Sequence, residues 1–235
     1  MIKEAIEKII SLKQPEAITI DGKTYRKDEY SPLLDTYPDA LEINNLTGIV
    51  DFINNNPESW KDLFIHVRDF NRVVLYQSMA GPFNQRNAIA IARSRPCEFA
   101  FGRQMSVEEF IISLRGQFVP SDDLSYLLTF VSGVKIDKNA KVEDDGVSQT
   151  ITARQGTSSL MTSTPIKPLV GLKPFRTLNE IDQPATDFVF RLKIGADDVP
   201  YCSLHSCDGE GWKQVAIQSI KSFFEQKQIE LPIIA

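Results

Sequence analysis

The sequence predicts an α+β fold of antiparallel hairpins, several amphipathic helices, a C-terminal helix and an extended apolar tail. Two strand pairs are joined by tight turns. The first covers residues 17–27, with Asp21 and Gly22 in the turn, and the second covers residues 63–79 around "RDFN". Helical patterns do not alternate singly with strands, which favours antiparallel over parallel sheets.

The helices are predicted from apolar spacing and from capping residues. Ile2, Ile6, Ile9 and Ile10 share one face of an N-terminal helix that Pro15 ends. The other expected helices cover residues 46–56, 106–118, 121–134 and 211–227. Ser106 and Glu109 have the spacing of a capping box, and Ser121 begins the helix that follows.

The chain from Val147 onward is expected to be mainly β. Alternation predicts strands over residues 147–154 and 187–195, the latter with Phe188 and Phe190 on its core face. Residues 155–168 are interpreted as a mobile loop because they are rich in Ser, Thr, Gly and Pro. The apolar tail, residues 229–235, is expected to pack on its own domain or on a neighbouring subunit. We expect an N-terminal α+β region over residues 1–120 and a mainly β region with a C-terminal helix over residues 121–235, possible parts of one continuous domain.

Composition indicates a soluble cytoplasmic protein with no membrane partner. The 235 residues carry a net charge of −5 with a pI of about 5.2, so no global field attracts nucleic acid. Three cysteines suit a reducing compartment better than a disulfide scaffold. No apolar run approaches the length that spans a bilayer.

No motif for catalysis, metal binding or cofactor binding is found. The G-x-S-x-G, G-x-x-x-x-G-K-[ST] and G-x-G-x-x-G patterns are absent. Cys202, His205 and Cys207 have the residue types of a metal site, but residues five apart on a strand point to opposite faces. The adjacent Asp pairs stand at helix starts and turns. We therefore predict no catalytic residue, metal ligand or cofactor, and favour a non-enzymatic role while the question of an enzyme stays open.

Arginines are concentrated in the middle of the chain. Residues 63–118 hold seven arginines, no lysine and four acidic residues, which gives a local charge of +3. The arginine fork favours bidentate contact with phosphate, and Phe70, Tyr76, Phe83 and Phe99 are interspersed as stacking platforms would be. Pairing with acidic residues elsewhere, or a subunit interface, is the alternative.

Two stretches, "DDGVSQTITARQG" and "KPLVGLKPFRTLNEIDQPATDFVFRL", resemble a family of phage and prophage proteins that includes the prophage protein YfdQ. The positions that match are Asp145, Gly146, Gln149, Gly156, Pro174, Arg176, Thr177, Glu180, Gln183, Pro184, Phe188 and Arg191. Leu178 and Thr186 depart mildly from the family pattern. The resemblance implies a phage or prophage setting, near replication and recombination genes. It implies no established activity and no catalytic residues.

The candidate binding residues are arginines in two regions: Arg68, Arg72 and Arg93 in the middle, and Arg154, Arg176 and Arg191 later in the chain. A structural network of the later arginines with Glu180 and Asp187 is the alternative to ligand binding. Three functions follow as hypotheses. The leading one is a phage-encoded, non-catalytic, self-associating binding or assembly protein. The others are binding of single-stranded nucleic acid in recombination or replication, and counter-defence against a host nucleotide signal or host protein.

Overall fold

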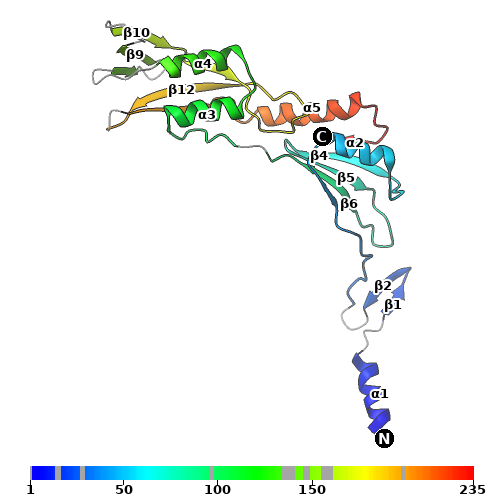
Figure 1. Ribbon diagram of the computed structural model, residues 1–235. Coiled ribbons are helices and arrows are strands. Elements are labelled where there is room, and N and C mark those ends of the chain that lie inside the picture. Colours follow the sequence, from blue (N-terminus) through cyan, green and yellow to red (C-terminus); the bar gives the residue numbers. More distant parts are fainter. Residues whose placement is uncertain are drawn as a thin grey trace.

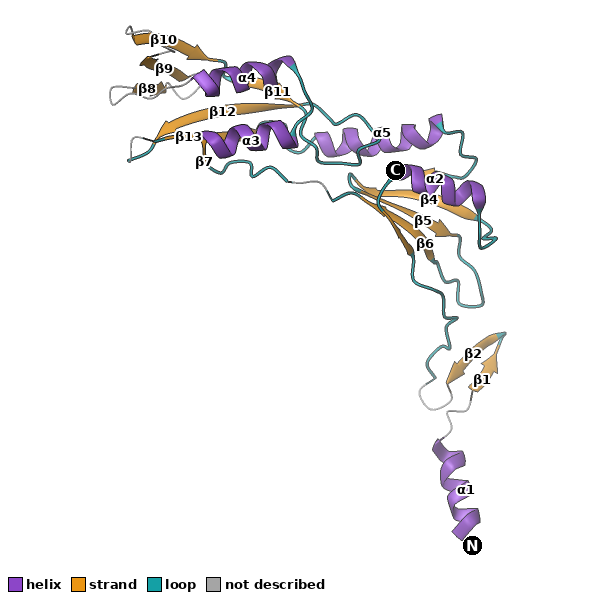
Figure 2. Cartoon of the chain, viewed as in Figure 1, coloured by secondary structure: helices purple, strands orange, loops and turns teal. Residues whose placement is uncertain are grey.

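The structure, a computed structural model, has the expected α+β fold (Figures 1 and 2). It describes residues 2–13, 17–26, 30–95, 98–133, 141–144, 149–154, 161–196 and 199–235. The strands form antiparallel and mixed sheets. Within these ranges, no helix has the length and apolar character needed to cross a membrane.

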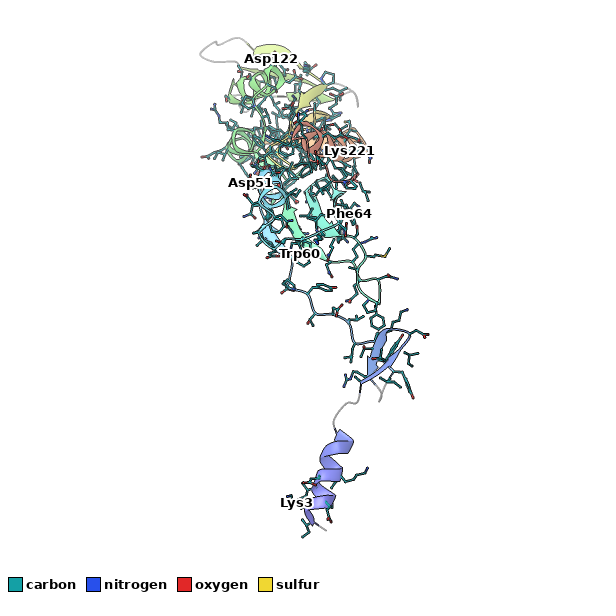
Figure 3. The ribbon with its side chains drawn as sticks, turned by 90° about the vertical axis from the view of Figure 1, so that its right-hand side faces the viewer. Lys3, Asp51, Trp60, Phe64, Asp122 and Lys221 are labelled. Atoms are coloured by element: carbon teal, nitrogen blue, oxygen red, sulfur yellow. The ribbon has the colours of Figure 1, made fainter. Side chains whose placement is uncertain are left out.

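An N-terminal arm stands apart from the body of the protein. It consists of α1 (Ile2–Lys13) and the hairpin of β1 (Ala17–Ile20) and β2 (Lys23–Arg26). Asp21 and Gly22 have positive φ of 51° and 76°, as the predicted two-residue turn requires. Figure 3 shows Lys3 of α1 far from the bulk of the molecule. The apolar face of α1 is therefore solvent-exposed, and the arm lends no packing to the body.

The first lobe is a five-stranded mixed sheet with two helices on one face. Its sheet order is β14-β4-β5-β6-β3, with the two edge strands parallel to their neighbours. The elements are β3 (Leu41–Ile43), α2 (Leu46–Asn55), β4 (Leu63–Asp69), β5 (Arg72–Gln77), β6 (Ala88–Arg93), α5 (Trp212–Gln226) and β14 (Ile233–Ile234). Alternate residues of the strands, such as Ile65, Leu75 and Ala90, pack with Ile49 of α2 and Phe224 of α5 in one core.

The ends of α2 explain why the sequence "NNLTGIVDFINNN" folds as a short helix. The Asn45 side chain accepts a hydrogen bond from Gly48 N, and Asn56 ends the helix in the left-handed conformation. The Glu180 carboxylate, far along the chain, accepts from Leu46 N at 2.7 Å and Thr47 N at 3.3 Å. A carboxylate at this position favours the helix because it faces the positive end of the helix dipole.

The second lobe is a four-stranded antiparallel sheet, also covered by two helices. Its sheet order is β11-β12-β13-β7. The elements are β7 (Met105–Ser106), α3 (Val107–Gln117), α4 (Asp122–Gly133), β11 (Leu169–Leu172), β12 (Thr186–Ile194) and β13 (Pro200–Ser206). The predicted core face of β12 is confirmed: Phe188, Phe190 and Leu192 are buried against Phe110 and Leu127 of the two helices.

A three-stranded antiparallel sheet adjoins the second lobe and corrects one expectation. It comprises β8 (Lys141–Asp144), β9 (Gln149–Arg154) and β10 (Met161–Ile166) in the order β10-β9-β8. The prediction of one loop over residues 155–168 was wrong for β10, whose Thr and Ser residues pair with β9 along its whole length. Pro165 is tolerated because β10 is an edge strand. Residues 155–160 lie outside the described part of the chain.

Neither lobe corresponds to a continuous half of the chain. The expected division near residue 120 falls between α3 and α4, which share one core. Helix α5 and the tail return to the first lobe, where Ile229, Leu231 and Ile233 pack against its core and Ile65 N donates to Pro232 O. The apolar tail thus packs on its own chain. The second lobe is inserted in sequence between β6 and α5.

The segment between β11 and β12 joins the two lobes. Leu178 and Ile181 belong to the first core, whereas Leu172 and Phe188 on either side of them belong to the second. The buried Gln183 amide holds this turn: its Oε1 accepts from Arg176 N and Thr177 N, and its Nε2 donates to Leu178 O and Ile181 O. The motif "PFRTLNEIDQP" is therefore a structural joint.

Candidate functional site: the outer face of the five-stranded sheet

The face of the first lobe's sheet opposite α2 and α5 carries a row of aromatic rings. We call it the outer face. Alternation along β4 places Phe64 and His66 on it, and the register pairs Phe64 with Tyr76 of β5. The Phe64 and Tyr76 rings are stacked, with centroids 5.5 Å apart and planes 22° apart, and His66 lies 6.2 Å from Tyr76. All three side chains are half-buried, so ring surface remains available to a ligand.

Arginines surround these rings. The guanidinium of Arg86 lies over the Phe64 ring, 5.4 Å from its centroid. Arg68 follows His66 by two residues at a bulge in β4, and Arg72 and Arg93 stand opposite each other on β5 and β6. Arg68 and Arg93 are exposed, so their guanidinium groups are within reach of solution anions.

The pairing of Arg72 with Arg93 is electrostatically unfavourable without an anion. Directly opposed residues of antiparallel strands have Cα atoms about 4.5 to 5.5 Å apart, and like charges in such pairs are destabilising. Among the described residues, no carboxylate lies within ion-pair distance of either guanidinium, and the buried Arg72 Nε has no hydrogen-bond partner. The Asp69 carboxylate, opposite Arg72, accepts from Phe70 N at 2.6 Å.

The structure places the six predicted arginines in separate regions. Arg68, Arg72 and Arg93 come together on the outer face. Arg191 lies on β12 of the second lobe, on the face away from its helices, and Arg176 lies in the joint. Arg154 ends β9, and its side chain is outside the described part of the structure.

Only Tyr76 of the four proposed stacking aromatics lies on the outer face. Phe70 contacts Trp212, Phe83 contacts Tyr25, and Phe99 is buried in the second core. Phe64, His66 and Arg86 were not among the predicted binding residues. Alternation within "LFIHVRD" was sufficient to put Phe64 and His66 on one face with Arg68, whereas nothing local indicated the contact of Arg86 with Phe64.

Arg176 is held by the joint in a partly buried position. Its guanidinium lies over the Trp212 ring, 3.9 Å from the centroid, and its Nη2 donates to Thr186 Oγ1 and to Pro184 O. Burial lowers the pKa of Arg176 to about 10, and the charge of Asp208 opposes that shift. Of the alternative network of Arg154, Arg176 and Arg191 with Glu180 and Asp187, the pairing of Arg176 with Glu180 is not formed, because the Glu180 carboxylate caps α2.

Asp208 is the acceptor that completes this network. Its carboxylate accepts from Thr186 Oγ1 at 3.1 Å, from Ser206 Oγ at 2.8 Å and from the backbone of Glu210 and Trp212. Burial alone raises the pKa of Asp208, but these hydrogen bonds outweigh it and hold the pKa below its usual range. The carboxylate therefore stays ionised at neutral pH and fixes the start of α5.

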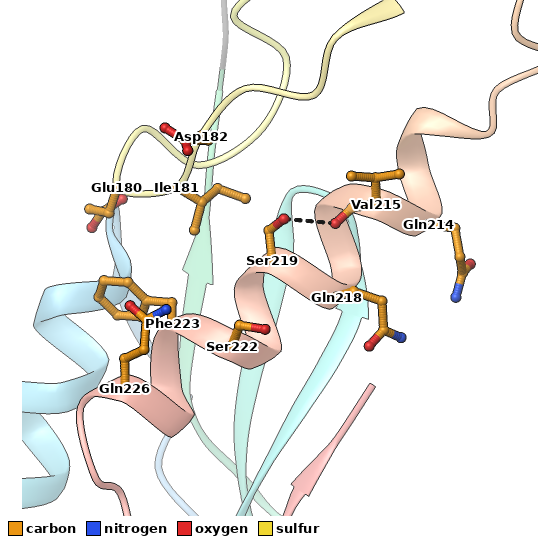
Figure 4. Close-up of a pocket in the computed structure, with 10 residues that line it drawn as sticks. All are labelled: Glu180, Ile181, Asp182, Gln214, Val215, Gln218, Ser219, Ser222, Phe223 and Gln226. Atoms are coloured by element: carbon orange, nitrogen blue, oxygen red, sulfur yellow. Dashed lines mark hydrogen bonds between the residues drawn. The ribbon is translucent and has the colours of Figure 1, made fainter.

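Three hollows lie near the joint. The first, of about 630 Å³, lies between α5 and the joint and is lined mostly by uncharged side chains such as Gln214, Gln218 and Ser222 (Figure 4). The second, of about 940 Å³, contains Arg93, Arg95 and Phe175. The third, of about 250 Å³, lies between the lobes and contains Arg176 and Trp212. The second hollow shares Arg93 with the outer face.

The residues considered for a metal site are divided between two faces of β13. Cys202 is buried in the second core, where burial raises its thiol pKa to about 12. His205 lies on the opposite face, within 3.1 Å of Ser203 Oγ, and Cys207 is exposed beyond the strand. The described residues contain no group of three His, Cys, Asp or Glu side chains placed to hold a metal ion.

Comparisons with protein-family models, curated proteins and solved structures find no match to this chain. The resemblance to phage and prophage proteins therefore stays a prediction. Several of its positions have structural roles here: Gln183 holds the joint, and Gln149 exchanges hydrogen bonds with the backbone of Leu192.

Proposed function

We propose that the protein binds single-stranded nucleic acid across the outer face. The observation that carries this proposal is the opposed pair Arg72 and Arg93 on the same face as the Phe64–Tyr76 stack, four positions along β5 from Tyr76. A phosphate between the two guanidinium groups would relieve their repulsion by charge-assisted hydrogen bonds. Unpaired bases would stack on the neighbouring rings, which a duplex does not allow because its bases are already stacked on one another.

The local charge of this face supports the proposal against the overall charge of −5. The four arginines on or over it are Arg68, Arg72, Arg86 and Arg93, whereas the nearest carboxylates in register are Glu42 and Asp69. Because exposed charges more than about 10 Å away are screened at 0.1 M salt, distant acidic residues weaken this field little.

Fluorescence anisotropy with a labelled single strand of about 12 nucleotides tests the proposal, a length within the roughly 4 to 16 nucleotides that small single-strand-binding folds cover. Affinity is expected to fall as salt is raised from 50 to 200 mM, and Arg68→Ala is expected to reduce the log–log slope by about 0.7, the value for one phosphate contact. A duplex of the same sequence serves as the control and should bind more weakly. Absence of binding at 50 mM salt would contradict the proposal.

The exposed face of α1 favours a second role, self-association, and we propose that a second copy of the chain covers it. Ile2, Ile6 and Ile9 are 79%, 51% and 58% exposed. Their spacing of four and three residues matches the seam of a coiled coil, in which identical helices bury identical faces. Light scattering after size exclusion should give a mass above 26.5 kDa, and Ile6→Glu should return it to that of the monomer. A wild-type monomer at micromolar concentration would defeat this role.

A further inference from the structure

We propose that the hollow between the lobes receives one base of the bound strand, and that it selects a base with an exocyclic amino group. This inference rests on the proposed function, since it extends the path of the same strand. The hollow, of about 250 Å³, is large enough for one base and too small for several nucleotides. Its walls include Phe70, Phe101, Phe175 and Trp212, with Arg176 and two glutamates at its polar end.

A continuous path leads from the outer face to this hollow. Arg93 ends β6 on the outer face and also lines the second hollow, together with Arg95. Phe175 lines both the second hollow and the hollow between the lobes. A strand whose phosphates contact Arg93 and Arg95 would therefore enter the second hollow, which Phe175 also lines.

Phe175 has the properties of a stacking platform. Its side chain is 36% exposed, although it belongs to the ordered joint. Phe175 N donates to Gln117 O, which fixes its backbone, yet its ring makes no contact with another aromatic ring in the described residues. The neighbouring rings are already engaged: Phe101 stacks on Phe188, and Phe70 meets Trp212 edge-on. Phe101 and Phe175, 37% and 36% exposed, both keep surface at the hollow, and of the two only Phe101 is engaged with another ring among the described residues.

The charges of the hollow favour a base over a phosphate. The Arg176 guanidinium lies over Trp212, its Nη2 donates to Thr186 and Pro184, and its buried Nε has no partner in the described structure. Glu98 and Glu210 line the same hollow; the Glu210 carboxylate pairs with Lys213 Nζ through Oε1 at 2.7 Å, and the Glu98 carboxylate would repel a phosphate. Carboxylates accept hydrogen bonds from amino groups such as cytosine N4. Thymine and uracil lack an exocyclic amino group and would present carbonyl oxygens to these carboxylates.

Anisotropy with two labelled homopolymers, 12 nucleotides of dC and 12 of dT, tests the inference. Both are pyrimidine strands, so their backbones and intrinsic stacking are similar. Wild-type protein is expected to bind oligo(dC) about tenfold more tightly, which corresponds to stacking and pairing of one base. Phe175→Ala should lower the affinity for both strands, because stacking is sequence-tolerant, and should lower that for oligo(dC) more, whereas Phe175→Tyr should retain the preference.

Glu210→Gln provides an independent variant, because it keeps the size of the side chain and removes the acceptor charge. It should lower the affinity for oligo(dC) and, because the repulsion of thymine carbonyls is relieved, should raise rather than lower the affinity for oligo(dT), so that the preference falls. Equal wild-type affinity for the two strands, or an equal loss for both in Phe175→Ala, would overturn the base pocket and leave binding to the outer face intact. Failure of both strands to bind would overturn both proposals.

Discussion

The two lobes share one architecture and differ in the face that each sheet turns away from its helices. In both, two helices cover one face with a core of aromatic and aliphatic side chains. The outer face of the first lobe carries stacked rings among arginines. The corresponding face of the second carries Asp187, Val189, Arg191, Lys193, Tyr201, Ser203 and His205, a mixture of both charges with no pair of stacked rings among the described residues. Equivalent packing therefore leaves the outward residues free to differ, and this difference is the reason for which we propose binding at the first lobe.

The largest expected effect separates stability from binding. Phe190→Ala removes a buried ring from the second core, where it contacts Phe110 and Phe130, and should lower the free energy of unfolding by about 3–5 kcal/mol. Urea denaturation measures this loss. Single-strand affinity below the unfolding transition should be unchanged, because the ring faces away from the proposed site. A parallel loss of affinity in the folded protein would break the division between inward and outward faces.

Reversing the charge of Arg72 and Arg93 is expected to remove most of the single-strand affinity that we propose for the first lobe. Arg72→Glu with Arg93→Glu should weaken single-strand binding by about 100-fold, since two phosphate contacts become repulsions worth roughly 1.4 kcal/mol each. Arg191→Glu with Lys193→Glu on the second lobe is the matched control, because it reverses the same number of strand cations on the outward face there. Fluorescence anisotropy measures the single-strand affinity of each variant. Equal effects of the two changes would mean that only net charge matters.

Removing one ring should have a smaller effect. Tyr76→Ala is expected to weaken binding about tenfold, because base–aromatic stacking contributes roughly 1–3 kcal/mol per base. Tyr201→Ala provides the comparison on the second lobe, where the tyrosine lies on the outward face of β13. Tyr76→Phe should bind as the wild type does. Unchanged affinity in Tyr76→Ala would leave the arginines as the sole determinant.

The smallest effect concerns the pH dependence of the second lobe. The Lys167 ammonium and the Gly171 N–H, at 2.5 Å and 2.6 Å from the Asp123 carboxylate, hold its pKa below the usual range. A lowered carboxyl pKa contributes stability above about pH 4, the unfolded value, and this stability is lost as pH falls through the folded pKa. Denaturation at pH 7 and pH 3 should therefore show a smaller difference for Asp123→Asn than for the wild type.

Local elements were predictable from sequence because their signals are local. The turn at Asp21 and Gly22, the Ser106 cap and the alternation of β12 are each encoded within a few residues. The β10 strand was missed because its Ser, Thr and Pro composition is also that of a loop. The return of α5 to the first lobe could not be foreseen, because its apolar face fits either core equally well by sequence.

The candidate site was only partly predictable, because its residues come together through strand pairing that has no local signal. The arginine-rich composition identified Arg68, Arg72 and Arg93, but their meeting on one face depends on the register of three strands. Composition also grouped them with Phe70 and Phe99, which the turn and the second core remove from that face. The contact of Arg176 with Trp212 joins residues 36 positions apart and has no local signal.

The insertion of the second lobe before α5 has a consequence for synthesis on the ribosome. Translation supplies roughly 5 to 20 residues per second, so strands β4, β5 and β6 emerge well before Ile220 and Phe224, which complete their core. The second lobe has all its strands once β13 has emerged, whereas the five-stranded sheet of the first lobe is complete only after α5 and β14 have emerged. The outer face, which carries the arginines, is therefore completed last. The second lobe, which contributes no strand to that sheet, is completed before it.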